Sequence, residues 1–204
     1  TQFNMQAMAV SPSGRYVIVG TSSDTGNYPV SVTSTDGSTW TTPTVMIDTS
    51  TNNTIINSIA VDSYGKFVAV GYNSTSSLGV SYTSTDGTTW SRSIINPSDT
   101  TQFEPFSVAV SPSGLWVTTG IRMIGTVGAY STSSNGTSWS TATDIVFNYP
   151  SNTIFNRLVA PLTSAVVADA TGHFVVLENA QRIRTGSPLH TILQEGAPIV
   201  AISN

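Results

Sequence analysis

Short apolar runs separated by turn residues recur along this chain of 204 residues. The runs at 16–19 (Tyr-Val-Ile-Val) and 67–70 (Phe-Val-Ala-Val) are apolar at successive positions, which is typical of strands buried on both faces. The segment 30–34 (Val-Ser-Val-Thr-Ser) alternates between apolar and hydroxyl side chains, which indicates a strand with two unlike faces. No segment of the sequence combines a helical period with helix caps. The pattern therefore predicts an all-β chain.

Two sequence blocks repeat at a nearly constant interval. The first is a tight turn that leads into a β-branched run, and its glycines are Gly14, Gly65, Gly114 and, in a weaker copy, Gly172. These glycines lie 51, 49 and 58 residues apart. The second block, Asp/Asn-Gly-x-x-Trp, follows in the first three copies and ends at Trp40, Trp90 and Trp139. The chain is therefore a tandem array of about four units.

Each unit is expected to form four short strands. The first two strands join at the glycine turn, strand three turns at Asp-Gly or Asn-Gly, which is a strong hairpin signal, and strand four begins at the tryptophan. A single four-stranded meander cannot bury both of its faces, so the units must stack, and radial stacking gives a β-propeller-type array of blades. We predict one repeat domain with units at about 5–55, 56–105, 106–160 and 161–197.

The C-terminal residues 198–204 resemble residues 106–112, which open the third unit. On that alignment they form the start of a fifth unit or a strand that closes the ring. Two explanations remain open. The sequence is a fragment of a longer propeller or part of a larger ring, or the last strand joins a neighbouring molecule by strand addition. The second explanation predicts a homo-oligomer or a larger assembly formed through the C-terminal strand.

The second block resembles the Asp-box, or bacterial neuraminidase (BNR) repeat, of sialidases and many other propellers. The usual pattern has one more residue between the acid and the tryptophan, and the third copy here has Asn instead of Asp. The resemblance covers most of residues 5–145 and implies a propeller, because such boxes occur in lectins, glycoside hydrolases, assembly factors and phage proteins alike. We expect a structural role for the box residues Asp36, Trp40, Asp86, Trp90, Asn135 and Trp139.

Composition narrows the function classes. The chain has 7 basic and 11 acidic residues and a net charge of −4, so it lacks the clustered cations that bind nucleic acid or anionic membranes. It contains no cysteine and no apolar run long enough for membrane insertion. One acid at each box turn supplies too few ligands for calcium, and no cofactor-binding motif is present. The low charge and the abundance of Ser, Thr, Asn and Gly favour an extracellular, cell-surface or virion-associated setting.

The two edges of the predicted blades differ. The links between strands one and two and between strands three and four are short and uniform, whereas the links at the opposite edge differ in every unit. A rigid scaffold with variable loops on one face is a common way to build a binding site. An equally acceptable interpretation is that these loops vary because nothing constrains them. The candidate ligand-binding residues in the variable loops are Asp24, Tyr28, Tyr72, Asn73, Glu104, Phe106, Arg122 and Arg157.

Three functions are compatible with these features. The first is a non-catalytic module for binding or adhesion that recognises a glycan or a protein surface through the variable edge. The second is a structural or assembly module of a virion or a cell-surface appendage. The third, a fragment of a sialidase-like glycosidase, needs an arginine cluster and a pair of catalytic carboxylates. The spacing of the six arginines and the glutamates does not identify such a set, so we predict that the chain has no catalytic residues and is not an enzyme.

Overall fold

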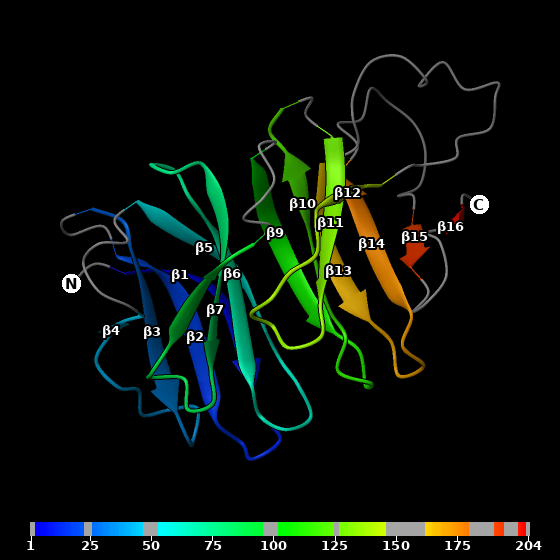
Figure 1. The fold of residues 1–204 in the computed structure, drawn as a ribbon. Coiled ribbons are helices and arrows are strands. Elements are labelled where there is room, and N and C mark those ends of the chain that lie inside the picture. Colours follow the sequence, from blue (N-terminus) through cyan, green and yellow to red (C-terminus); the bar gives the residue numbers. More distant parts are fainter. Residues whose placement is uncertain are drawn as a thin grey trace.

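The computed structural model describes residues 3–22, 26–46, 53–95, 102–124, 127–145, 162–179, 190–193 and 200–202. Within these ranges the chain forms four antiparallel sheets of four strands each, and every sheet consists of strands that follow one another in the sequence (Figure 1). The described residues include no helix that is long and apolar enough to cross a membrane. The prediction of an all-β chain of four-stranded meanders is confirmed.

The strands pair in chain order within each sheet. The first sheet contains β1 (Phe3–Val10), β2 (Tyr16–Ser22), β3 (Tyr28–Ser34) and β4 (Thr44–Val45). The second contains β5 (Thr54–Val61), β6 (Phe67–Asn73), β7 (Leu78–Ser84) and β8 (Ser91–Ile94). The third contains β9 (Phe103–Val110), β10 (Trp116–Arg122), β11 (Val127–Ser133) and β12 (Thr143–Asp144). The fourth contains β13 (Leu162–Ala168), β14 (Phe174–Asn179), β15 (His190–Leu193) and β16 (Val200–Ile202).

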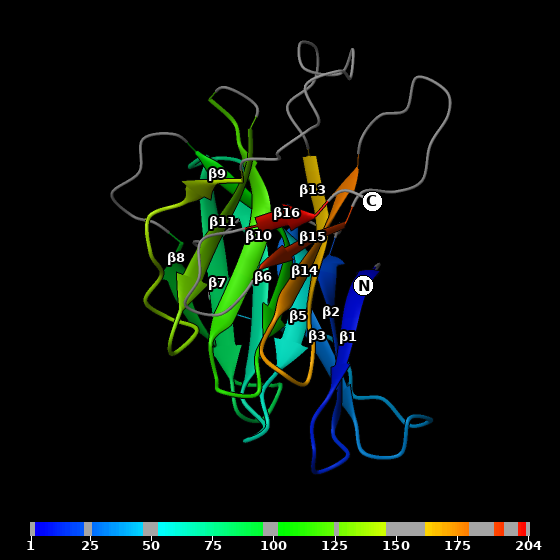
Figure 2. The same cartoon turned by 90° about the vertical axis from the view of Figure 1, so that its right-hand side faces the viewer.

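The glycine turns between the first and second strands have the same geometry in all four sheets. The glycine of each turn has φ between 82° and 92°, in the left-handed region that favours glycine. Its N–H donates to the carbonyl of the residue three positions earlier, as from Gly14 to Ser11 at 2.9 Å and from Gly114 to Ser111 at 3.0 Å. Figures 1 and 2 show these four turns at the same edge of the molecule. The repeated sequence block therefore reports a repeated backbone conformation.

The fourth strands of the first and third sheets start later than predicted. We expected strand four to begin at the tryptophan, but β4 and β12 begin at Thr44 and Thr143 and are only two residues long. The Oγ1 atom of Thr41 accepts the N–H of Thr33 at 3.0 Å, and Ser140 Oγ accepts that of Thr132 at the same distance. These hydroxyls replace the backbone acceptor and shorten the regular ladder.

Each first strand contains a one-residue irregularity at the same place. In the second sheet the register shifts between Ile56 and Ser58, opposite Gly71. A Cβ atom on Gly71 would overlap the carbonyl oxygen of Ile55, and Gly20 and Gly120 stand in the same relation to the carbonyls of Asn4 and Glu104. In the first three sheets, the glycine that ends the β-branched run therefore allows the bulged strand to approach closely.

The sheets pack face to face through three apolar clusters. Val17 and Val19 of β2 pack against Phe67 and Ala69 of β6 in the first cluster. The opposite face of β6, with Val68 and Val70, packs against the third sheet in the second cluster. The third cluster joins the third and fourth sheets and contains Ala109, Val117, Ile145, Val166, Phe174 and Val176. The continuous apolar runs are therefore strands covered on both faces, as their pattern predicts.

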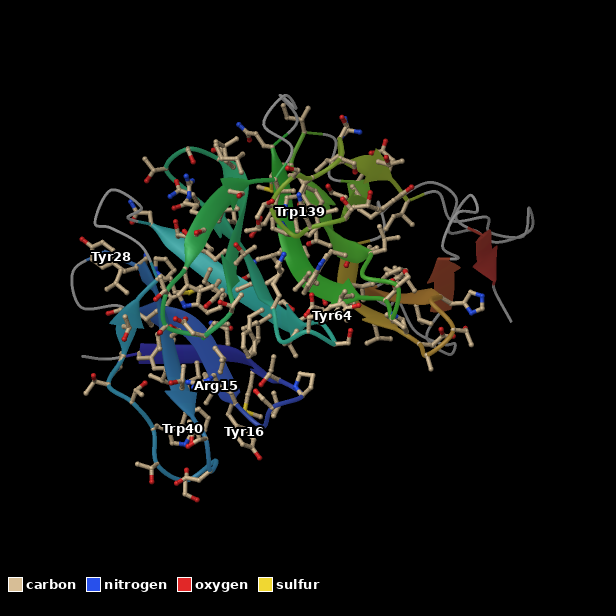
Figure 3. The ribbon with its side chains drawn as sticks, turned by 60° about the horizontal axis from the view of Figure 1, so that its bottom comes forward. Arg15, Tyr16, Tyr28, Trp40, Tyr64 and Trp139 are labelled. Carbon is tan, nitrogen blue, oxygen red and sulfur yellow. The ribbon has the colours of Figure 1, made fainter. Side chains whose placement is uncertain are left out.

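The first strands line the inner side of the array. Strand β1 contacts β5, β5 contacts β9, and β9 contacts β13. Figure 3 shows the four sheets following one another in an arc, with the first and fourth sheets at its ends. Sheets that stack in chain order, each with its first strand innermost, have the arrangement of propeller blades.

Strand β16 lies in the fourth sheet and does not start a fifth unit, whereas the alternative that the C-terminal strand closes a ring stays a prediction. Strand β16 (Val200–Ile202) pairs antiparallel with β15 and is the outermost strand of the fourth sheet. The resemblance of residues 198–204 to the start of the third unit rests on alternating small and β-branched residues, which any short strand can contain. Such a pattern does not specify the position of a strand in its sheet.

Candidate functional site

The box turns bind their own backbone. The Oδ1 atom of Asp36 accepts the N–H groups of Ser38 at 2.8 Å and Thr39 at 2.7 Å, and also the hydroxyl of Ser34 at 2.9 Å. Ser34 Oγ in turn accepts the N–H of Gly37 at 2.9 Å. The same bonds recur around Asp86, and around Asn135 through its amide oxygen. The side chain at this position therefore holds the turn in shape.

These hydrogen bonds lower the pKa of the box carboxylates. The backbone N–H groups of Thr39 and Ser38 hold the pKa of Asp36 well below its usual range. Burial acts to raise the pKa of Asp86, but the N–H groups of Thr89 and Thr88 outweigh it and the net shift is downward. Both carboxylates therefore stay ionised in the folded chain at neutral pH.

Replacing both Asp36 and Asp86 with asparagine will make the stability of the chain less sensitive to acid. Because the folded-state pKa of each carboxyl is below its unfolded value of about 4, these groups stabilise the fold above about pH 4 and lose that contribution as the pH falls. Asparagine keeps the acceptor oxygen, as Asn135 shows, but does not titrate. Urea unfolding at about pH 7 and about pH 2.5 measures the difference. An unchanged loss of stability on acidification would contradict this assignment.

The box tryptophans connect neighbouring sheets. Trp90 Nε1 of the second sheet donates to Ser31 Oγ on β3 of the first sheet at 3.1 Å, and to Gly87 O at 3.2 Å. Ser31 Oγ donates to Gly87 O at 2.9 Å. Trp139 makes the same contact with Ser81 of the second sheet at 2.9 Å. The second and third boxes therefore fasten their own sheets to the third strand of the preceding sheet, a contact that we call the backward clamp.

The ends of the array differ from this pattern. Trp40 belongs to the first sheet and stacks edge-on against Tyr16 of that sheet, with ring centroids 6.3 Å apart (Figure 3). In the third sheet, the position equivalent to Ser31 and Ser81 is occupied by Tyr130. The register shows this equivalence: Ser31 lies opposite Val19, Ser81 opposite Val70 and Tyr130 opposite Thr119. The fourth unit has no box tryptophan that could donate a hydrogen bond to a serine at this position of the third sheet.

The predicted ligand-binding residues lie at the edge opposite the box turns, but in strands instead of loops. Tyr28 is the first residue of β3, Tyr72 and Asn73 end β6, and Arg122 ends β10. Glu104 lies near the start of β9. The loops are shorter than predicted because strand pairing extends through these residues. The structure thus brings five candidates to one edge of three successive sheets, which we call the loop edge.

The other three candidates do not join this group. Phe106 lies further along β9, at the bulge where Pro105 and Ser107 face consecutive residues of β10. Asp24 and Arg157 lie outside the described residues. Their assignment as ligand-binding residues stays a prediction.

Two of the loop-edge residues are held by other side chains. Asn73 is buried, donates to Thr54 Oγ1 at 2.9 Å and accepts the N–H of Ser76 at 2.8 Å, so it shapes the β6–β7 turn. Arg122 forms an ion pair with Asp144 of β12 at 2.6 Å. The sequence analysis did not identify Asp144, because only the β11–β12 register brings it to this edge.

Glu104 is the unusual ionisable group of this edge. Burial raises the pKa of its carboxyl above the ordinary value. Glu104 pairs with Ile121, next to Arg122, so an acid and a cation occupy adjacent register positions. Tyr28 and Tyr72 are half-buried on the neighbouring sheets. In the part of the chain that the structure describes, no group of three or more His, Asp or Glu side chains is placed to hold a metal ion.

The fold is similar to that of several solved proteins. YCF48 from Cyanidioschyzon merolae matches with a TM-score of 0.61 and 18% identity over 100% of this chain and 58% of that protein. The K499G mutant of NanB sialidase from Streptococcus pneumoniae matches with a TM-score of 0.62 and 16% identity over 86% of this chain and 28% of NanB. Penicillium chrysogenum α-L-arabinanase matches with a TM-score of 0.55 and 18% identity over 91% and 60%. No protein-family model and no curated protein matches the sequence.

These similarities define the class of fold. The chain is a propeller-type array of four-stranded blades, as predicted, and it shares that architecture with both YCF48 and glycosidases. It spans less than two thirds of the length of each of these three proteins. At such low identity the likeness concerns the fold alone, and the function must be argued from the residues of the chain.

Proposed function

We propose that this chain is a non-catalytic binding module that recognises a glycan through the loop edge. We further propose that its boxes are shortened members of the Asp-box family. The observation that carries the proposal is the contrast between the two edges. At the box edge, Asp36, Asp86 and Asn135 use their acceptor oxygens on their own turns. The loop edge instead combines different aromatic and ionisable residues on each sheet.

The chemistry of the loop edge suits a sugar. Tyr28 and Tyr72 provide aromatic rings beside hydroxyl groups, and aromatic faces pack well against the apolar faces of sugar rings. Arg122 and Glu104 add a donor and a carboxyl group on the adjacent sheet. Because these residues sit at strand ends, their positions are fixed by the sheets, and little side-chain ordering is needed on binding.

Replacing Tyr72 with alanine will weaken glycan binding at least about tenfold, because the ring supplies contact area at the edge. Glycan-array screening followed by calorimetry with a bound glycan measures the change. The matched control is Tyr64→Ala, because Tyr64 is 93% exposed in the β5–β6 turn at the opposite edge. An array without binding, or equal loss in both variants, would contradict the proposal.

The non-catalytic part of the proposal has a separate test. Hydrolysis of a fluorogenic sialoside or arabinoside by the purified chain, abolished by Glu104→Gln, would show that the loop edge is an active site. Glu104 is chosen because its raised pKa suits a general acid. We expect no hydrolysis above the uncatalysed rate.

A further inference from the structure

The first sheet exposes the face that every later sheet buries. Met8 pairs with Ile18, as Ile59 pairs with Ala69 in the second sheet. Met8 is 55% exposed, whereas Ile59 is 7% exposed. The equivalent residues of the third and fourth sheets, Val108 and Val166, are 5% and 4% exposed. This position is therefore covered wherever a sheet precedes it.

Other residues of the same face repeat the contrast. Met5 is 67% exposed, whereas its equivalent Ile56 is 0% exposed and belongs to the first apolar cluster. We define the outward face of the first sheet by Met5, Met8, Val10, Tyr16, Ile18 and Trp40. It is apolar, and β1 contains no charged residue. An uncharged apolar face of this kind is typical of a surface that another element covers.

The first box also differs from the other two in what lies nearest to its glycine. A Cβ atom on Gly87 would meet Val17 Cγ2 of the preceding sheet at 2.5 Å, and one on Gly136 would meet Val68 Cγ2 at 2.6 Å. For the same atom on Gly37, the three nearest atoms all belong to the Tyr16 ring of its own sheet, the first at 3.7 Å. The first box thus has the sequence of a backward clamp and, among the described residues, no preceding sheet to fasten.

The fourth sheet carries the complementary face. By register, Ala165, Val167 and Val175 correspond to Ala7, Ala9 and Val17, first-sheet residues that cover the second sheet. Val167 is 56% exposed.

We propose that the outward face of the first sheet binds the fourth sheet of a second copy of this chain. The contact continues, between molecules, the sheet-to-sheet interface that joins the sheets within one molecule. Because the two faces differ, the contact is head-to-tail, and such contacts either close into rings or continue as filaments. Two molecules together contribute eight sheets, which is within the range of four to eight blades found in propellers. The assembly that we propose is therefore the closed dimer of eight sheets.

The test uses the full chain and two variants that each block one face. Met8→Lys places a charge on the first sheet, and Val167→Lys places one on the fourth. Both side chains are more than half exposed, so neither change disturbs the core. Sedimentation of the unmodified chain should show a dimer, and each variant alone should have a dissociation constant raised about 100-fold, because an unpaired charge is buried in the contact.

An equimolar mixture of the two variants distinguishes head-to-tail pairing from other modes. In the mixture, the unmodified first-sheet face of one variant can bind the unmodified fourth-sheet face of the other, so an open heterodimer held by this single contact should form where each variant alone is monomeric. Tyr64→Lys, on an exposed turn away from both faces, should dimerise like the unmodified chain. A monomeric unmodified chain, dimers that only Met8→Lys disrupts, or a mixture that stays monomeric would each overturn the proposal.

Discussion

Replacing Gly71 with alanine will lower the free energy of unfolding by at least about 3 kcal/mol. The reason is crowding by backbone atoms. A Cβ atom at this position would overlap the Ile55 carbonyl oxygen and lie 3.0 Å from the Cα atom of Ile56. Neither atom belongs to a flexible side chain that can rotate away, so the bulge in β5 must shift and with it the close approach of β5 and β6. Urea denaturation monitored by tryptophan fluorescence gives the free energy.

The matched control for Gly71 is Gly65. Gly65 has φ of 86° and no atom within 4 Å of its Cβ position, so Gly65→Ala adds backbone strain without crowding. That strain costs about 1–2 kcal/mol. If both variants lose the same stability, the close approach at Gly71 does not contribute as we expect.

Replacing Trp90 with alanine will cost about 3–5 kcal/mol of stability. The indole is 7% exposed, it belongs to the apolar cluster between the first two sheets, and its N–H reaches Ser31 across that boundary. Truncation leaves a cavity at the boundary and removes the clamp at the same time. Thermal and urea unfolding of dilute protein both report the loss.

Trp40 gives the comparison within the same chain. It has the same place in its box, but its described ring contact is with Tyr16 of its own sheet, and it is only half-buried. Trp40→Ala should therefore cost about 1 kcal/mol in dilute, monomeric protein. Equal losses at the two positions would mean that the indole stabilises its own hairpin and not the contact between sheets.

The sequence predicted the parts of the fold that depend on local chemistry. The repeated turns that contain Gly14, Gly65 and Gly114 have a left-handed position that favours glycine, and Asp-Gly specifies a hairpin with its own hydrogen bonds. Both signals act over a few residues, so their positions were predicted correctly. The stacking of sheets followed from the apolar runs, since strands with two apolar faces need a cover on each side.

The features that sequence reasoning missed depend on pairing between strands. Tyr28, Tyr72 and Arg122 were expected in loops because they lie next to polar residues, but the strand ladders extend through them. Residues 198–204 were predicted to start a fifth unit or to close the ring, and their pairing in the fourth sheet was missed because so short a strand carries too little pattern to specify its partner. Asp144 was not recognised as the partner of Arg122 because their contact crosses 22 residues of sequence.

The backward clamp joins residues that are a nearly constant distance apart in the sequence, so it closes loops of nearly equal length. Trp90 reaches Ser31 across 59 residues and Trp139 reaches Ser81 across 58, so both connections span nearly equal lengths of polypeptide. Because the entropy lost on closing a loop depends on its length, each added blade incurs nearly the same loss, however many precede it. If instead the first and last segments of a chain had to pair, the entropy lost on closing that loop would grow with chain length. With the backward clamp, each further blade adds about the same entropy loss.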